Sequence, residues 1–204
     1  MGNGFSEQPG FLPSVPFFQS FHMAILGLDS AGKTTTLYRL RFNEFVNTVP
    51  TRGFNAEKVK LSLGGHRTAA TFHFWDVGGQ EKLRPLWKSY TRGADGIVFV
   101  VDSVDGERLE EAKTELHRIA KTMENLGVPV LVVANKQDLR NSLTLAEMER
   151  GLALKELGPG TPWHLQPACA ITGDGLREGM EKIHDMILKR RKAQQQLQQQ
   201  RRKR

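Results

Sequence analysis

The chain has 204 residues, which suits one domain with short tails and is long enough to bury a hydrophobic core. Its net charge of +7 comes from residues 189–204, which hold eight basic side chains and no acidic one and leave 21 basic against 22 acidic residues elsewhere. This distribution excludes a basic nucleic-acid-binding domain. The single cysteine, Cys169, excludes an internal disulfide framework. No run approaches the roughly 18 apolar residues of a membrane span.

The first six residues, from Met1 to Ser6, match the pattern for N-myristoylation, in which removal of the methionine exposes Gly2. The alternative is a solvated leader with a chance match to the pattern. Five of the eleven phenylalanines fall within the first 21 residues, however, and three prolines oppose one continuous helix. For residues 1–20 we therefore predict an apolar, irregular segment that packs on the domain or enters a bilayer interface.

An apolar run from Phe21 to Leu26 predicts a buried parallel strand, and the pattern from Thr35 to Phe42 predicts a helix. The glycine-rich loop between them could be an ordinary turn, but every fixed position of the phosphate-loop pattern G-x-x-x-x-G-K-[ST] is present. Its backbone amides can surround phosphate oxygens, Lys33 can reach the outer phosphates, and the Thr34 hydroxyl can bind Mg²⁺. The loop consists of Gly27, Leu28, Asp29, Ser30, Ala31, Gly32, Lys33 and Thr34.

A hairpin is predicted from two strand-like runs, Glu57 to Leu63 and Thr68 to Trp75, with two glycines at the turn. The second run leads into a loop with the residues of a second nucleotide-facing segment. Asp76 can hold Mg²⁺ directly or through water, the Gly79 amide can meet a terminal phosphate, and Gln80 can orient a water molecule.

Continuous apolar runs at residues 96–101 and 128–134 predict two further parallel strands that are buried on both faces. The intervening residues 107–125 have the period of an amphipathic helix, whose charges we interpret as a solvated face without a chemical role. A capping box at Thr144 and Glu147 predicts a helix that ends near Leu157.

Residues 163–170 predict a last strand, and the closing helix is marked by four apolar side chains at helical spacing: Leu176, Met180, Ile183 and Ile187. The glutamine-rich run and the basic residues beyond it are expected to form a fraying helix or a disordered tail. These patterns predict an N-terminal segment of residues 1–20, a single α/β domain of residues 21–190, and a tail of residues 191–204.

The strand of residues 128–134 leads into Asn135-Lys136-Gln137-Asp138, at the edge of a parallel sheet where ligands bind. The Asp138 carboxylate can accept hydrogen bonds from guanine N1–H and the 2-amino group, whereas adenine would leave it unpaired. Asn135 can brace the loop, and the Lys136 stem can lie over the purine. These residues predict a guanine nucleotide as the ligand, and an ATP-using phosphate-loop enzyme is the disfavoured alternative.

The nucleotide-facing segments stand in the order and spacing of the five loops of small GTPases, which this chain resembles. Three runs narrow the resemblance to the ADP-ribosylation-factor-like family: Gly27-Leu28-Asp29, Pro50-Thr51-Arg52-Gly53-Phe54-Asn55, and the run from Trp75 to Trp87. The Met1-Gly2-Asn3 start, the long hairpin and the Lys/Arg-rich tail are similar to those of the type-four subgroup. The resemblance implies a small-GTPase (P-loop NTPase) domain with a six-stranded, mostly parallel sheet and helices on both faces.

The resemblance also implies the residues of the site. Lys33 and Gln80 would act in the hydrolysis of GTP to GDP, and Mg²⁺ would be held by Thr34, Thr51 and Asp76. GTP or GDP would contact the whole phosphate loop together with Thr51, Gly79, Asn135, Lys136, Asp138 and, through an amide facing guanine O6, Ala170.

Three aromatic residues, Phe54, Trp75 and Tyr90, match the family's exposed triad for effectors, with ordinary core aromatics as the alternative. The chain departs from the family at three places. Its hairpin is longer than in the founding members, where the hairpin slides in register and expels the N-terminal segment when GTP binds. Ile171 replaces a threonine that is common in the fifth loop, and for Arg52 we expect a solvent-facing side chain, with an arginine finger as the alternative.

We expect a GTP-operated membrane switch with slow hydrolysis that an activating protein accelerates. One myristoyl chain at Gly2 binds a membrane only marginally, and residues 189–204 would add attraction to anionic lipids, so the expected places are the cytosol and the cytoplasmic face of the plasma membrane. The resemblance implies exchange factors, activating proteins and effectors as partners, with cytohesin-type exchange factors among the effectors, in membrane traffic and actin signalling. The alternative is a constitutively GTP-loaded scaffold whose tail directs nuclear entry through importin or contacts nucleic acid.

Overall fold

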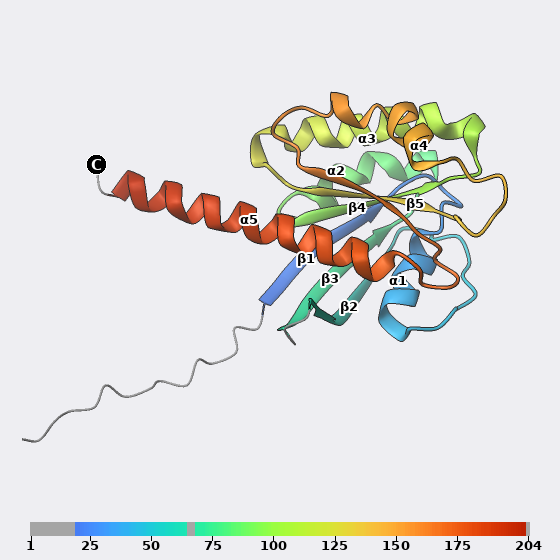
Figure 1. The fold of residues 1–204 in the computed structure, drawn as a ribbon, viewed down its shortest axis with the longest axis horizontal. Helices are drawn as coiled ribbons and strands as arrows, with labels where there is room; N and C mark the ends of the chain where they lie inside the picture. The colour runs from blue at the N-terminus through green and yellow to red at the C-terminus, as the bar shows by residue number, and fades with distance from the viewer. Residues whose placement is uncertain (1–18, 65–67, 203–204) are drawn as a thin grey trace, which may run out of the picture.

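Six strands form one sheet in the order β2-β3-β1-β4-β5-β6 (Figure 1). The computed structural model describes residues 19–64 and 68–202. Among the described strands, β2 is antiparallel to β3 and all other neighbours are parallel, which confirms the predicted α/β sheet. The strands are β1 (Gln19–Leu26), β2 (Phe54–Leu63), β3 (Thr68–Val77), β4 (Gly96–Asp102), β5 (Val130–Asn135) and β6 (Trp163–Pro167).

Helices cover both faces of this sheet because its strands are apolar on both sides (Figure 1). In β1, Phe21, Met23 and Ile25 belong to the core beneath α1 and α5, whereas Ala24 and Leu26 belong to the core beneath α3. All five side chains are completely buried. The helices α1 (Lys33–Phe42) and α5 (Leu176–Arg202) lie on one face, and α2 (Trp87–Thr91), α3 (Leu109–Met123) and α4 (Leu145–Gly151) lie on the other.

The hairpin pairs ten residues of β2 with ten of β3, from Phe54 opposite Val77 to Leu63 opposite Thr68. Both strands are longer than predicted and reach the loops that the sequence assigns to the nucleotide. The loop before β2 and the loop after β3 therefore lie side by side, and the Gly78 amide donates to the Gly53 carbonyl oxygen at 2.8 Å.

The helix α4 is shorter than predicted. Its capping box is present, since the Thr144 hydroxyl accepts from the Glu147 amide and the Glu147 carboxylate accepts from the Thr144 amide. The helix nevertheless ends at Gly151, because Ala153 has a φ of 48°, a left-handed conformation that cannot continue an α-helix. A short 3₁₀ turn, Leu154–Glu156, follows in its place.

The helix α5 continues unbroken through most of the segment predicted as a tail (Figure 1). Two of its basic side chains are bound to the domain. Arg191 donates to Asp95 Oδ1 at 2.8 Å with its guanidinium 4.5 Å from the centre of the Phe21 ring, and Arg190 Nε donates to the Leu126 carbonyl oxygen at 2.8 Å. Within the described part of the chain, no helix is both long and apolar enough to cross a membrane.

Candidate nucleotide-binding site

The phosphate loop connects β1 to α1 at the carboxyl edge of the sheet. Its first glycine has no room for a side chain, because a Cβ on Gly27 would lie 2.1 Å from the Val100 carbonyl oxygen. Gly32 has a φ of 93° at the start of α1, a conformation that glycine adopts without strain. The loop lines a cavity of about 260 Å³ together with the loop before β2 and the loop after β3. The structure thus brings together the segments that the sequence assigns to phosphates.

Lys33 is a buried cation in the wall of this cavity, with 6% of its surface exposed. Its Nζ donates to the Leu28 carbonyl oxygen at 2.8 Å. Burial lowers the pKa of the ammonium from 10.5 to about 8, against the opposing attraction of Asp76 and Asp29. A cation held in so little water is suited to phosphate oxygens, which would supply the missing stabilisation of its charge.

Three oxygen-bearing side chains meet near Lys33. The Thr34 hydroxyl donates to Asp76 Oδ2 at 2.7 Å and lies 2.9 Å from the Thr51 hydroxyl oxygen. Asn55 Nδ2 also donates to Asp76 Oδ2, at 3.0 Å, whereas the buried Oδ1 has no hydrogen-bond partner in the part of the chain that the structure describes. An unpartnered carboxylate oxygen close to two hydroxyls fits the all-oxygen ligands that Mg²⁺ prefers.

The loop after β3 packs directly on the phosphate loop. A Cβ on Gly79 would lie 2.4 to 2.5 Å from the Asp29 amide nitrogen, the Leu28 carbonyl carbon and the Gly27 carbonyl oxygen. Glycine alone permits this approach, since any other residue would push the two loops apart. Gln80, the predicted water-orienting residue, lines the same cavity.

The residues predicted to bind the base surround a second cavity, of about 210 Å³. Asn135 joins two loops there, because its Nδ2 donates to the Ala31 carbonyl oxygen at 2.8 Å and its Oδ1 accepts the Ala170 amide at 2.9 Å. The Ala170 amide, which the resemblance assigns to guanine O6, thus donates to Asn135 in this structure. Lys136 and the exposed Asp138 line the same cavity.

Arg39 of α1 is a residue of this region that the sequence patterns miss. Its guanidinium donates to the carbonyl oxygens of Ala170 and Ile171, and also to that of Asn43 at 3.0 Å. The side chain ties the loop at the base cavity to the helix that begins at the phosphate loop. No local pattern reveals such a contact, because 131 positions separate Arg39 from Ala170.

A model of the ADP-ribosylation factor family matches residues 12–187. The chain belongs to that family. Human ADP-ribosylation factor-like protein 4A is 72% identical over 204 residues, with all of both chains covered. Human protein 4C is 67% identical over 180 residues, which cover 88% of this chain and 93% of the relative, and human protein 4D is 57% identical over 194 residues, which cover 95% and 96%.

Among solved structures, the Arl6 BBS3 small GTPase from Trypanosoma brucei, with the bound nucleotide analogue GppNp, matches with a TM-score of 0.73 at 30% sequence identity. The match covers 84% of this chain and 99% of that one. The protein is therefore an Arf-like small GTPase of the type-four subgroup. It binds GTP and GDP with Mg²⁺, hydrolyses GTP to GDP and phosphate, and acts as a GTP-binding switch.

In this Arf-like protein, a Gly79→Ala substitution should weaken GTP binding about tenfold and change GDP binding less than twofold. The added methyl group would separate the loop after β3 from the phosphate loop, at the place where we expect the terminal phosphate of a triphosphate to bind. Dissociation rates of fluorescent GTP and GDP analogues measure both effects. Gly106→Ala is the control, since a Cβ there meets nothing within 4 Å, and equal losses for both nucleotides in Gly79→Ala would contradict the prediction.

The three aromatic residues that match the family's effector triad lie together. The ring centres are 5.4 Å apart for Phe54 and Trp75, 5.4 Å for Phe54 and Tyr90, and 5.8 Å for Trp75 and Tyr90. Phe54 is half exposed, whereas Trp75 and Tyr90 are partly buried against the core. The three residues therefore form an aromatic cluster in which one ring, that of Phe54, is exposed and two pack against the core.

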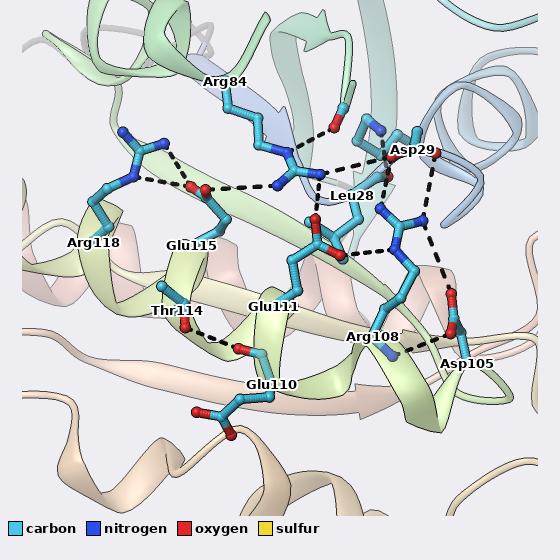
Figure 2. Close-up of polar contacts among 12 residues, drawn as sticks. Leu28, Asp29, Arg84, Asp105, Arg108, Glu110, Glu111, Thr114, Glu115 and Arg118 are labelled. Carbon is cyan, nitrogen blue, oxygen red and sulfur yellow. Dashed lines mark hydrogen bonds and ion pairs between the residues drawn. The ribbon is translucent and has the colours of Figure 1, made fainter. Parts of the chain in front are cut away.

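The charges of α3 are not simply a solvated face, and the interpretation from the sequence is wrong at this point. Figure 2 shows Glu111 and Glu115 turned toward Arg84, whose guanidinium lies 2.8 Å from the first carboxylate and 3.7 Å from the second. Arg108, just before α3, donates to Asp29 of the phosphate loop at 2.8 Å. An amphipathic period does not distinguish a charge that faces water from one that faces an ion of another segment.

Proposed function

We propose that the protein is a membrane-attached switch whose loops around Thr51 and Gly79 take the arrangement described here when GTP is bound and are released on hydrolysis. The observation that carries the proposal is the meeting of the Thr34 and Thr51 hydroxyls with the Asp76 carboxylate, together with the packing of Gly79 on the phosphate loop. In GTPases generally, the terminal phosphate and its Mg²⁺ hold the switch loops in this way.

In this proposal the groups that line the phosphate cavity have separate roles. Lys33 contacts the outer phosphates, the Gly79 amide meets the terminal phosphate, and Gln80 orients the attacking water. Thr34, Thr51 and Asp76 would hold Mg²⁺, which would supply positive charge to the phosphate oxygens.

The residues of the base cavity make the protein selective for guanine nucleotides. The exposed Asp138 carboxylate accepts the two guanine donors, and the aliphatic stem of Lys136 lies over the ring. Asn135 holds the base loop and the phosphate loop together through its two hydrogen bonds, so that base and phosphates bind to one rigid frame.

Hydrolysis without a partner is expected to be no faster than about 10⁻⁴ s⁻¹. Arg52 is exposed, and Arg84 and Arg108 bind carboxylates of the protein itself. Arg84 and Arg108 are thus engaged within the protein, and for Arg52 we expect a solvent-facing side chain, so we propose that an activating protein provides a cation to the terminal phosphate.

Attachment to the membrane is proposed from the two ends of the chain, of which residues 1–18 and 203–204 lie outside the described residues. The start of β1 and the end of α5 lie at the same end of the domain, opposite the carboxyl edge of the sheet (Figure 1). A myristoyl group on Gly2 and the basic side chains of the helix would act together at one anionic surface. We therefore propose the cytoplasmic face of the plasma membrane, in exchange with the cytosol, as the site of action, where effectors such as cytohesin-type exchange factors would bind the aromatic cluster.

The paired substitution Arg201→Gln with Arg202→Gln should lower binding of the full-length, myristoylated protein to phosphatidylserine vesicles at least about fivefold. Each cation near an anionic leaflet contributes up to about 1 kcal/mol, and both side chains are exposed at the free end of α5. Cosedimentation with vesicles of stated composition measures the binding.

The matched control is Arg190→Gln with Arg191→Gln, which removes the same charge from side chains that bind the domain. We expect this pair to lower the thermal midpoint and to lose less vesicle binding. Equal losses for the two pairs would show that the free end of α5 is not the membrane contact.

A further inference from the structure

Just after β3, the carbonyl oxygens of two consecutive glycines each accept a hydrogen bond from a buried side chain. Trp87 Nε1 donates to the Gly78 carbonyl oxygen at 3.0 Å, and Arg84 Nε donates to the Gly79 carbonyl oxygen at 2.9 Å. In a planar trans peptide, the C=O and N–H groups point in opposite directions. The two bonds therefore turn the amides of Gly79 and Gln80 away from these side chains, and both residues line the phosphate cavity.

Arg84 is itself held by carboxylates from two other segments (Figure 2). Its Nη2 lies 2.8 Å from Glu111 Oε1 and 3.7 Å from Asp29 Oδ1, and its Nη1 lies 3.7 Å from Glu115 Oε1. One guanidinium, only 6% exposed, thus connects the loop after β3 with α3 and with the phosphate loop. A planar cation with five donors can make these contacts at once, which a single ammonium group cannot.

A second arginine holds Asp29. Arg108 Nη2 donates to Asp29 Oδ1 at 2.8 Å, and its Nε donates to Glu111 Oε2 at 2.8 Å (Figure 2). The hydrogen bond from Arg108 lowers the pKa of the Asp29 carboxyl, so this group stays an anion. Because Asp29 lines the phosphate cavity, its charge would repel a nucleotide if no cation faced it.

We propose that Arg84 is a positioning residue that aims the Gly79 and Gln80 amides at the terminal phosphate and fastens this arrangement to α3 through Glu111. The inference rests on the proposed switch function and adds the group that orients the switch loop. GDP has no terminal phosphate for these amides, so Arg84 acts on GTP selectively. Arg108 acts through Asp29 on the phosphate loop, which both nucleotides contact, so it acts on both.

The test compares Arg84→Gln, Arg108→Gln and Arg118→Gln in the full-length chain with Mg²⁺ present. Dissociation rates are measured for fluorescent GTP and GDP analogues. For Arg84→Gln we expect release of the GTP analogue to be about tenfold faster and release of the GDP analogue to change less than twofold. Arg108→Gln should accelerate both by a similar factor. Arg118 binds Glu115 from the exposed side of α3, and its variant should change neither.

Removing a buried arginine could also impair folding, so a second variant separates the two effects. Arg84→Lys retains the charge beside Glu111 but has no planar fork that also reaches the Gly79 carbonyl oxygen. We expect a thermal midpoint near that of the wild type with GDP bound, together with the same selective loss of GTP.

Equal acceleration for the two nucleotides in both Arg84 variants, or unchanged rates, would overturn the proposed role of Arg84. Failure of the switch function itself would look different. In that case the wild type would show the same hydrogen exchange over residues 48–90 with GDP and with a GTP analogue. If the wild type shows a difference and the Arg84 variants keep the wild-type ratio of rates, only the positioning role is wrong.

Discussion

Replacing Asp138 with asparagine should transfer the base preference of the protein from guanine to xanthine. The carboxylate can accept hydrogen bonds from both N1–H and the 2-amino group of guanine, whereas the asparagine amide would present a donor to that amino group. Xanthine has a carbonyl oxygen at the same ring position and would match the amide. Binding of GDP should fall at least about a thousandfold, as for sites that lose a required hydrogen-bond partner, and binding of XDP should rise.

Competition of unlabelled GDP and XDP against a fluorescent nucleotide measures this exchange of preference. Asp185→Asn is a suitable control, because it removes an exposed carboxylate from α5 and should leave both affinities unchanged. Retention of GDP binding by Asp138→Asn, without any gain for XDP, would show that Asp138 does not read the base.

Replacing Gln80 with leucine should lower GTP hydrolysis at least about tenfold while GTP binding stays close to that of the wild type. The leucine side chain has about the same size but cannot hydrogen-bond the attacking water, whereas the contacts of the phosphate loop with the nucleotide remain. Release of phosphate in a single turnover over several hours measures the rate without an activating protein.

Arg52→Gln provides the comparison for this experiment, since the exposed Arg52 is expected to contribute less than twofold. A rate that falls with Arg52→Gln would identify a built-in arginine finger. A rate that is the same in the wild type and in Gln80→Leu would favour the constitutively GTP-loaded scaffold over the switch.

Local patterns were sufficient for much of the fold and for the arrangement of the candidate site. The central strands β1, β4 and β5 each have an apolar run, and the phosphate loop and the Asp138 loop follow β1 and β5 directly. Parallel strands end at one edge of a sheet, so these loops meet without any further information. The placement of Thr51 beside Asp76 follows in the same way from the hairpin, whose two strands connect the two loops.

The contacts that the sequence did not reveal join charges from distant segments. Arg84 meets Asp29 and Glu111, and Arg39 meets Ala170, only because the helices pack on the sheet at fixed positions. In the sequence these residues look like solvent-facing charges of amphipathic helices and loops. The early end of α4 is similar, since nothing in the residue type of Ala153 indicates its positive φ.

The basic tail shows the same limit. The sequence has eight basic residues at its C-terminal end, and they look like one exposed tail. In the structure, however, Arg190 and Arg191 bind the domain and hold α5 against it. The availability of these two side chains to a membrane depends on their tertiary packing, which the composition does not reveal. The free end of the helix is therefore the part that we expect to respond to anionic lipids.

The central claim is that one terminal phosphate sets the conformation of residues 48–90. Hydrogen exchange of the full-length protein, measured by mass spectrometry with GDP and with a non-hydrolysable GTP analogue, tests it most directly. We expect slower exchange in residues 48–55 and 78–90 with the GTP analogue, and equal exchange in β5 and β6. Identical exchange of residues 48–90 in the two complexes would contradict it.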